Sequence, residues 1–102
     1  GEVPYVLTPV AVDDRQARPI RPPIVEYPIR AAERGLEGSC EVRFSVTARG
    51  EPFDVKPDCS HQLFEAAAKR AVLRSEFAPR IDKGRPVEVR NVVYPIEFKL
   101  ES

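Results

Sequence analysis

Residues 40–46 alternate strictly between apolar and polar side chains, and this alternation limits the possible folds more than any other feature. The apolar set is Cys40, Val42, Phe44 and Val46. A period of two indicates a strand with one buried and one solvated face. Arg49 and Gly50 supply a turn, after which Phe53 and Val55 resume the apolar pattern. The stretch therefore predicts an antiparallel hairpin.

A two-residue loop at Arg49 and Gly50 sets the register of this hairpin and aligns all its apolar side chains on one face. The predicted pairs are Val46 with Phe53, Phe44 with Val55, Val42 with Pro57, and Cys40 with Cys59. Directly opposed β-carbons lie about 4.5–5.5 Å apart, which a disulfide can span. We predict a Cys40–Cys59 disulfide and an oxidising compartment. The alternative is two reduced, buried thiols in a cytosolic protein.

Two helices are predicted, one before and one after the hairpin in the sequence. The first follows Pro28 and ends at Gly35, which suits a helix end. The second begins at Ser60 as N-cap and ends at residues 77–79. Its apolar side consists of Leu63, Phe64, Ala67, Ala68, Ala71 and Val72. Each helix can cover the apolar face of the sheet.

The last strand is predicted over residues 87–100, after a turn at residues 83–86. Its apolar alternation changes phase between Val89 and Val92, which predicts a bulge near Arg90 and Asn91. Pro95 has no N–H to donate, so its nitrogen must face an open edge. An apolar edge strand is a site where another chain can pair.

Proline sets the domain boundaries, because six of the eleven prolines fall within the first 28 residues. Residues 1–22 are predicted to be a Pro-rich linker or arm, and residues 23–102 the compact domain. About 100 residues usually build a single core. The predicted fold class is α+β, with two layers: a three-stranded antiparallel sheet packed against two helices.

The composition gives little support to catalysis. Sixteen basic residues balance sixteen acidic ones, so no nucleic-acid partner is expected. His61 is the only histidine and is predicted to be a surface or helix-terminus group rather than a general base. Two cysteines and one histidine are too few for a metal site. We therefore expect the chain to be no enzyme and to bind no metal and no cofactor.

The sequence starts at Gly1, which suits a fragment of a longer protein, and such a protein could carry an anchor upstream.

An ordered set of residues resembles the TonB C-terminal domain family over about residues 23–100. The set comprises Tyr27-Pro28, Ala31-Ala32, residues 35–38, Phe44, Gly50, Phe64, Ala67-Ala68, residues 77–79, residues 84–87 and Phe98. The resemblance implies a periplasmic domain of an energy transducer that is anchored in the inner membrane. It also implies that ExbB–ExbD engages the missing N-terminal region and that this domain binds outer-membrane receptors.

In that family a receptor segment, the TonB box, adds as a strand beside the last strand. The resemblance maps the partner-binding residues to Arg90, Asn91, Val92, Val93, Tyr94, Pro95, Ile96 and Glu97, with Tyr27 and Pro28 carried over as well. Tyr27 and Pro28 also have a purely structural interpretation, as do Tyr94 and Ile96. Two other functions stay open: an accessory or sensor module of another envelope protein, and self-pairing through the last strand. The expected state is a monomer or a weak homodimer.

Overall fold

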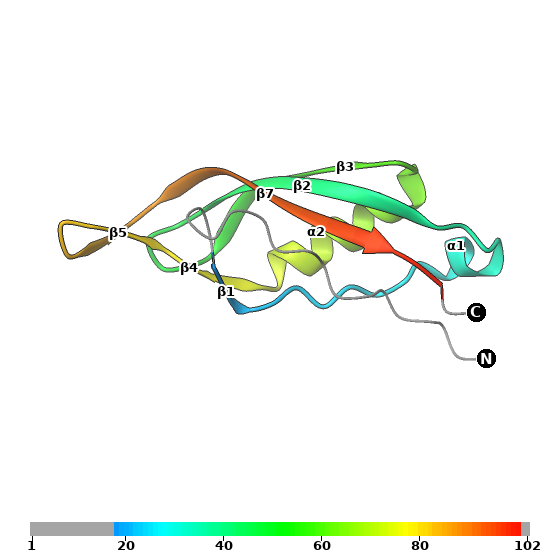
Figure 1. Cartoon of the computed structure of the whole chain (residues 1–102), viewed down its shortest axis with the longest axis horizontal. Coiled ribbons are helices and arrows are strands. Elements are labelled where there is room, and N and C mark those ends of the chain that lie inside the picture. Colours follow the sequence, from blue (N-terminus) through cyan, green and yellow to red (C-terminus); the bar gives the residue numbers. More distant parts are fainter. Residues whose placement is uncertain (1–17, 101–102) are drawn as a thin grey trace.

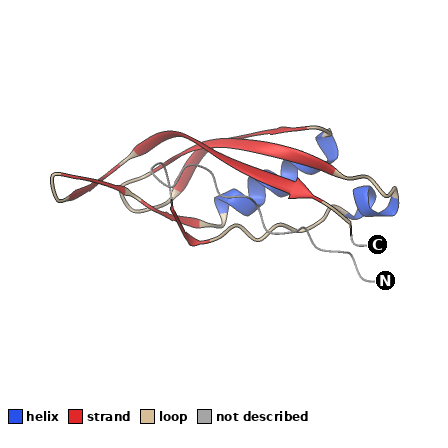
Figure 2. Cartoon of the chain, in the orientation of Figure 1, coloured by secondary structure: helices blue, strands red, loops and turns tan. Residues whose placement is uncertain are grey.

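The computed structural model describes residues 18–100 and places a three-stranded antiparallel sheet at the centre of the domain (Figure 1). The sheet has the order β3-β2-β7, with β2 at Gly38–Val46, β3 at Pro52–Cys59 and β7 at Val89–Phe98. Helix α2 (Glu65–Leu73) packs beneath it, and α1 (Ile29–Glu33) lies at one end (Figure 2). The predicted α+β fold with a three-stranded sheet and two helices is confirmed.

Helix α1 begins and ends where the sequence predicts. Pro28 occupies the N-cap, and Gly35 follows the helix with a φ of +66°. The Gly35 N–H donates to the Ala32 carbonyl (3.1 Å) and the Leu36 N–H to the Ala31 carbonyl (2.8 Å). These two bonds satisfy carbonyls that the helix end leaves free, and they use the left-handed conformation that glycine adopts without strain.

The second helix starts differently from the prediction. A 3-10 turn, η1 (Gln62–Phe64), precedes α2, and its N-cap is His61 rather than Ser60. The His61 Nδ1 accepts the Leu63 N–H (3.1 Å), while the Ser60 hydroxyl accepts the Ser39 N–H (3.1 Å). The His61 ring nitrogen therefore caps the turn, while the Ser60 hydroxyl is hydrogen-bonded to β2 instead. His61 is the helix-terminus group that the sequence predicts.

Helix α2 also ends earlier than predicted, at Leu73. The Ser75 hydroxyl donates to the Val72 carbonyl (2.6 Å) and the Ala71 carbonyl (3.2 Å), which satisfies the last turn. The chain is then extended at β4 (Glu76–Ala78). The predicted helix end at residues 77–79 is therefore wrong: these residues lie beyond the helix, and Phe77 within β4 is fully buried.

The hairpin register is confirmed in one half and wrong in the other. Cys40 lies opposite Cys59 and Val42 opposite Pro57, as predicted, but Val46 lies opposite Pro52 instead of Phe53. The register changes at Phe44, where β3 has one extra residue and Asp54 adopts a φ of +53°. This β-bulge turns Phe53 away from the buried row, so it is only half-buried.

The turn between β2 and β3 explains the shift. It is longer than the predicted two residues, because the Thr47 N–H donates to the Glu51 carbonyl (2.9 Å) and the Gly50 N–H to the Thr47 carbonyl (2.9 Å). The Thr47 hydroxyl also accepts the N–H groups of Arg49 and Glu51 (3.2 and 3.1 Å). A threonine side chain thus organises a wider loop than the Arg49-Gly50 pair alone indicates.

Two small sheets lie outside the predicted architecture. Strand β1 (Arg18–Arg21) pairs with β4, and β5 (Arg80–Asp82) pairs with β6 (Arg85–Val87) through a turn in which Lys83 and Gly84 have positive φ. Figure 1 shows the β5–β6 hairpin projecting from one end, which helps to give the domain its 50 × 20 × 19 Å extents. Strand β1 belongs to the segment that the sequence assigns to the arm. The arm's residues 1–17 lie outside the described range.

The core lies between the sheet and α2. Tyr27 packs edge-to-face against Phe64 and Phe98 (centroid distances 5.9 and 5.6 Å), and Phe64 stacks on Phe98 (4.3 Å). A second aromatic group joins Phe77 to Phe44 and Tyr94. The two groups hold β7 against the rest of the domain at its last residue, Phe98, and near its middle, at Tyr94.

Candidate partner-binding edge

Strand β7 is an edge of the central sheet. It pairs with β2 in an unbroken ladder from Phe98, opposite Gly38, to Val92, opposite Phe44. Within residues 18–100, its other side pairs with no strand. The predicted bulge at the start of β7 is confirmed, because Asn91 has a φ of +61° and the register changes between Val92 and Val89. The regular, open part of the edge is therefore residues 92–98.

One hydrogen bond determines which backbone groups of β7 face outward. The Ser60 N–H donates to the Ser39 carbonyl (2.8 Å), so residues 39, 41 and 43 of β2 bond to β3. The even-numbered residues of β2 must then bond to β7, opposite Val92, Tyr94 and Ile96. The backbone groups of Val93, Pro95 and Glu97 consequently point to the open edge. Pro95 leaves no gap in the β2–β7 ladder, as the sequence predicts.

The side chains of the predicted binding segment divide into two sets. Val92, Tyr94 and Ile96 are buried against the helix layer and also direct their backbone groups to β2. Val93 and Pro95 are half-buried and Glu97 is exposed, all on the opposite face of the sheet. Arg90 and Asn91 are exposed at the bulge, where Arg90 pairs with Glu88 (2.7 Å). Only the odd-numbered set offers both backbone and side chains at the edge.

The structure places Tyr27 in the core. Its side chain is 4% exposed, and its hydroxyl donates to the Leu36 carbonyl (2.5 Å). Burial, together with the negative charge of Glu37, raises the pKa of Tyr27 above its usual value of 10.0. Pro28 is half-buried at the start of α1. The aromatic contact of Tyr27 with β7 is with Phe98, inside the domain.

The disulfide lies on the side of β2 away from the open edge. Cys40 and Cys59 are bonded, with their Cα atoms 4.0 Å apart and a sequence separation of 19. They occupy a pair without ladder hydrogen bonds, where opposed residues approach most closely.

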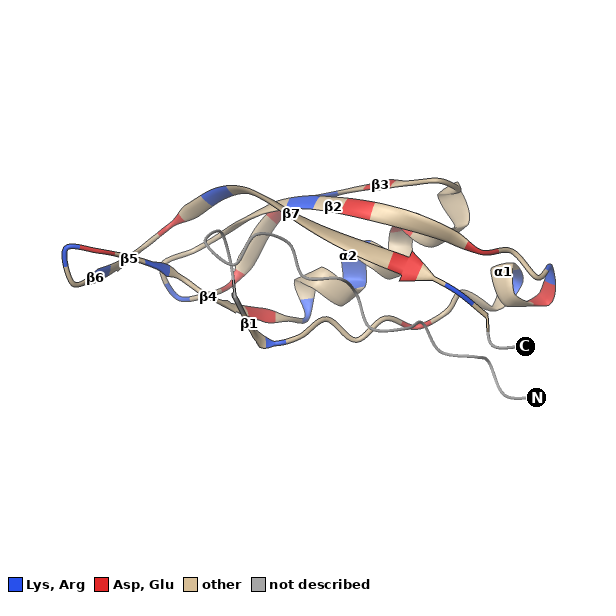
Figure 3. Cartoon of the chain, viewed as in Figure 1, with Lys and Arg blue, Asp and Glu red and all other residues tan. Residues whose placement is uncertain are grey.

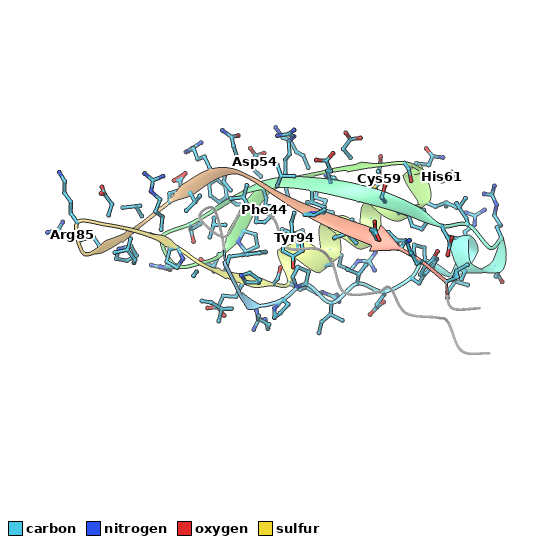
Figure 4. All side chains as sticks on the ribbon, viewed as in Figure 1. Phe44, Asp54, Cys59, His61, Arg85 and Tyr94 are labelled. Atoms are coloured by element: carbon cyan, nitrogen blue, oxygen red, sulfur yellow. A yellow bond between two sulfur atoms is a disulfide. The ribbon has the colours of Figure 1, made fainter. Side chains whose placement is uncertain are left out.

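Figure 4 shows Cys59 near His61, far from Arg85 at the tip of the β5–β6 hairpin. The bond links β2 to β3 and leaves β7 free.

Other kinds of site have little basis in the described residues. Across residues 18–100, no group of three or more His, Cys, Asp or Glu side chains gathers as metal ligands would. None of the helices within residues 18–100 qualifies as a membrane span by length and hydropathy. The charged side chains on the exposed face of β2 and β3 have no role predicted from the sequence. Their alternation with buried residues places them on one face, and the register predicted from the sequence already sets Glu41 opposite Asp58 and Arg43 opposite Lys56.

Comparison with known proteins agrees with this arrangement. The profile of the family described as Gram-negative bacterial TonB protein C-terminal matches residues 23–100. The chain is 38% identical over 80 residues to protein tonB2 of Pseudomonas aeruginosa strain PAO1, and 29% identical over 96 residues to protein TonB of the same strain. These matches cover 76% and 90% of this chain but only 29% and 27% of those proteins.

Solved structures show the same fold. The solution NMR structure of the Pseudomonas aeruginosa TonB CTD superposes with a TM-score of 0.72 at 27% identity, covering 92% of this chain and 96% of that one. A structure of the TonB2 protein from Vibrio anguillarum gives a TM-score of 0.64 at 27% identity, covering 99% and 100%. With the family profile matching more than half of its length, the chain belongs to the family of TonB C-terminal domains of Gram-negative bacteria.

Proposed function

We propose that this chain is the periplasmic C-terminal domain of a TonB-type energy transducer. It binds the TonB box of an outer-membrane receptor by strand addition and so couples proton-motive force to active uptake. The open edge of β7 carries this proposal, because Val93, Pro95 and Glu97 turn their backbone groups outward over a regular stretch. Family membership supports the same assignment.

Strand addition suits a partner of variable sequence. Main-chain hydrogen bonds provide affinity whatever the side chains are, and side chains at alternate positions add preference. The edge offers N–H donors at Val93 and Glu97 and carbonyl acceptors at all three outward residues. A pull along the added strand loads these bonds together, and the β2–β7 ladder then receives the load over residues 92–98.

The remaining parts of the mechanism lie outside this chain, which spans less than a third of its curated relatives. In the proposed protein, an N-terminal segment anchors the transducer in the inner membrane and engages ExbB–ExbD. This domain contributes binding rather than catalysis and needs no cofactor. The Cys40–Cys59 disulfide suits the oxidising periplasm.

The test is a titration of the isotopically labelled domain with peptides from candidate receptor N-termini, followed through its backbone amides. We expect saturable shifts concentrated on residues 90–98. Val93→Pro removes an outward N–H without touching the β2 ladder, so it should weaken binding about tenfold. Val93→Ala is the matched control, because it keeps the N–H. Unmoved amides with every cognate peptide would contradict the proposal.

The same open edge favours one second candidate, pairing with another copy of the chain. Sedimentation over a range of concentrations separates the two functions. A dimer that Val93→Pro disrupts and that receptor peptides leave intact would support self-pairing. A monomer that binds peptide supports the transducer role.

A further inference from the structure

The open face of the sheet carries charges in an unusual order. Arg43 lies directly opposite Lys56, and in the next outward-facing row Glu41 lies directly opposite Asp58. All four side chains are exposed. Like charges placed directly opposite each other destabilise a sheet. The register therefore creates a basic row beside an acidic row, and Figure 3 shows the basic and acidic bands next to each other on β2.

These charges form no ion pairs with one another. The only one of the four in an ion pair within residues 18–100 is Lys56, whose Nζ lies 3.7 Å from Asp54 of its own strand. If Glu41 and Arg43 exchanged places, each row would contain one basic and one acidic residue. The arrangement thus keeps a positive and a negative row separate at the expense of some stability.

Both rows continue onto β7, where the residue in each row is uncharged. Val93 lies opposite Arg43, and Pro95 lies opposite Glu41. These two β7 residues are uncharged and half-buried. The third row ends in a charge, since Glu97 lies opposite Ser39. A strand added at the edge therefore meets Glu97 directly, and meets the charges of Arg43 and Glu41 across one uncharged neighbour.

The distance allows such contacts. Neighbouring strands lie about 4.8 Å apart, so a residue of an added strand lies roughly 10 Å from its counterpart on β2. A long arginine side chain and a carboxylate side chain can close this distance over a residue as small as valine. The same holds for Glu41 and a lysine or arginine over Pro95.

We propose that this face selects the charge pattern of the added strand: an acidic residue opposite Val93, and basic residues opposite Pro95 and Glu97. Side chains on one face of a strand are two positions apart. The preferred partner is thus a peptide with an acidic, a basic and a basic residue at alternate positions, in one of the two chain directions. The inference rests on the proposed strand addition and deepens it.

The test uses peptides of about ten residues in a neutral, strand-forming background. Two matched peptides carry Glu, Lys and Lys at alternate positions, one read from the N-terminus and the other from the C-terminus. Two reversed-charge peptides carry Lys, Glu and Glu in the same two orders. A fifth, neutral peptide carries Gln at all three positions. Each exposed ion pair changes affinity roughly 1.4- to 5-fold. We expect the matched peptide of one chain order to bind about tenfold tighter than its reversed-charge partner, with the difference lost in ~1 M salt.

The doubly exchanged variant Arg43→Glu with Glu41→Lys keeps the net charge and should invert the preference at two of the three positions. The matched control, Lys56→Asp with Asp58→Lys, changes the same charges one strand farther away and should leave the preference in place. Equal affinities for all five peptides, or a preference that the Arg43 and Glu41 exchange leaves unchanged, would overturn this inference while strand addition stands. Failure of every peptide, the neutral one included, would count against strand addition itself.

Discussion

Reduction of the Cys40–Cys59 disulfide is expected to lower the free energy of unfolding by about 3 kcal/mol. The two cysteines are 19 residues apart, so the bond closes a loop of about 20 residues in the unfolded chain. The chain-entropy relation gives ~11 cal/mol/K for such a loop, which is ~3.3 kcal/mol at room temperature. The native state should change little, because the ladder hydrogen bonds of the neighbouring β2–β3 pairs do not depend on the disulfide.

The assay is thermal unfolding followed by circular dichroism, with and without a reductant. For a domain of this size about 3 kcal/mol corresponds to a fall in Tm of about 15 °C. The chain has only two cysteines, so the reductant acts at one place. A Cys40→Ala, Cys59→Ala variant is the control and should not respond. A fall of less than about 3 °C, or an equal fall in the control, would refute the loop-closure reasoning.

Three further predictions concern glycine and tyrosine residues. Gly50→Ala should destabilise the domain by well over 1 kcal/mol in urea unfolding, because Gly50 has a φ of +89° and a β-carbon there would overlap the Phe77 carbonyl. Gly35→Ala, at φ +66° in open space, should cost only about 1 kcal/mol; equal costs would contradict the steric argument. Tyr27→Phe should cost about 1–2 kcal/mol by leaving the Leu36 carbonyl unpaired, and no change in the urea midpoint would contradict that bond. Burial raises the pKa of Tyr94, and burial with the Glu37 charge raises that of Tyr27. The folded state then holds these protons more tightly, so stability should be complete below about pH 10 and fall above it, and a flat urea midpoint there would refute this.

Local pattern and short-range pairing determined much of the fold. The alternation over residues 40–46 predicted β2, and its pairing with residues 57–59 predicted the disulfide. The phase change near Asn91 predicted the bulge, and Pro95 predicted that β7 is an edge. These features depend on a period of two and on the chemistry of single residues, so they can be read without knowing what lies nearby in space.

The elements that the sequence did not predict depend on partners far along the chain. Strands β1 and β4 are four and three residues long, too short to show a period, and more than fifty residues separate them. Strands β5 and β6 are almost wholly exposed and lack an apolar alternation. Their pairing arises from tertiary placement and turn geometry.

The candidate site shows the same division. By itself, the sequence determined that residues 90–97 lie on an edge strand with alternating faces, because Pro95 and the apolar period require it. The predicted register already places Arg43 opposite Lys56 and Glu41 opposite Asp58. Only the tertiary structure decided that Tyr27 lies inside the core and that the β2–β3 pairing shifts beyond Arg43. The physical reason is that the register shift depends on the wider turn at Thr47 and the bulge at Asp54, and the packing of Tyr27 depends on aromatic partners far along the chain, neither of which a period of two can report.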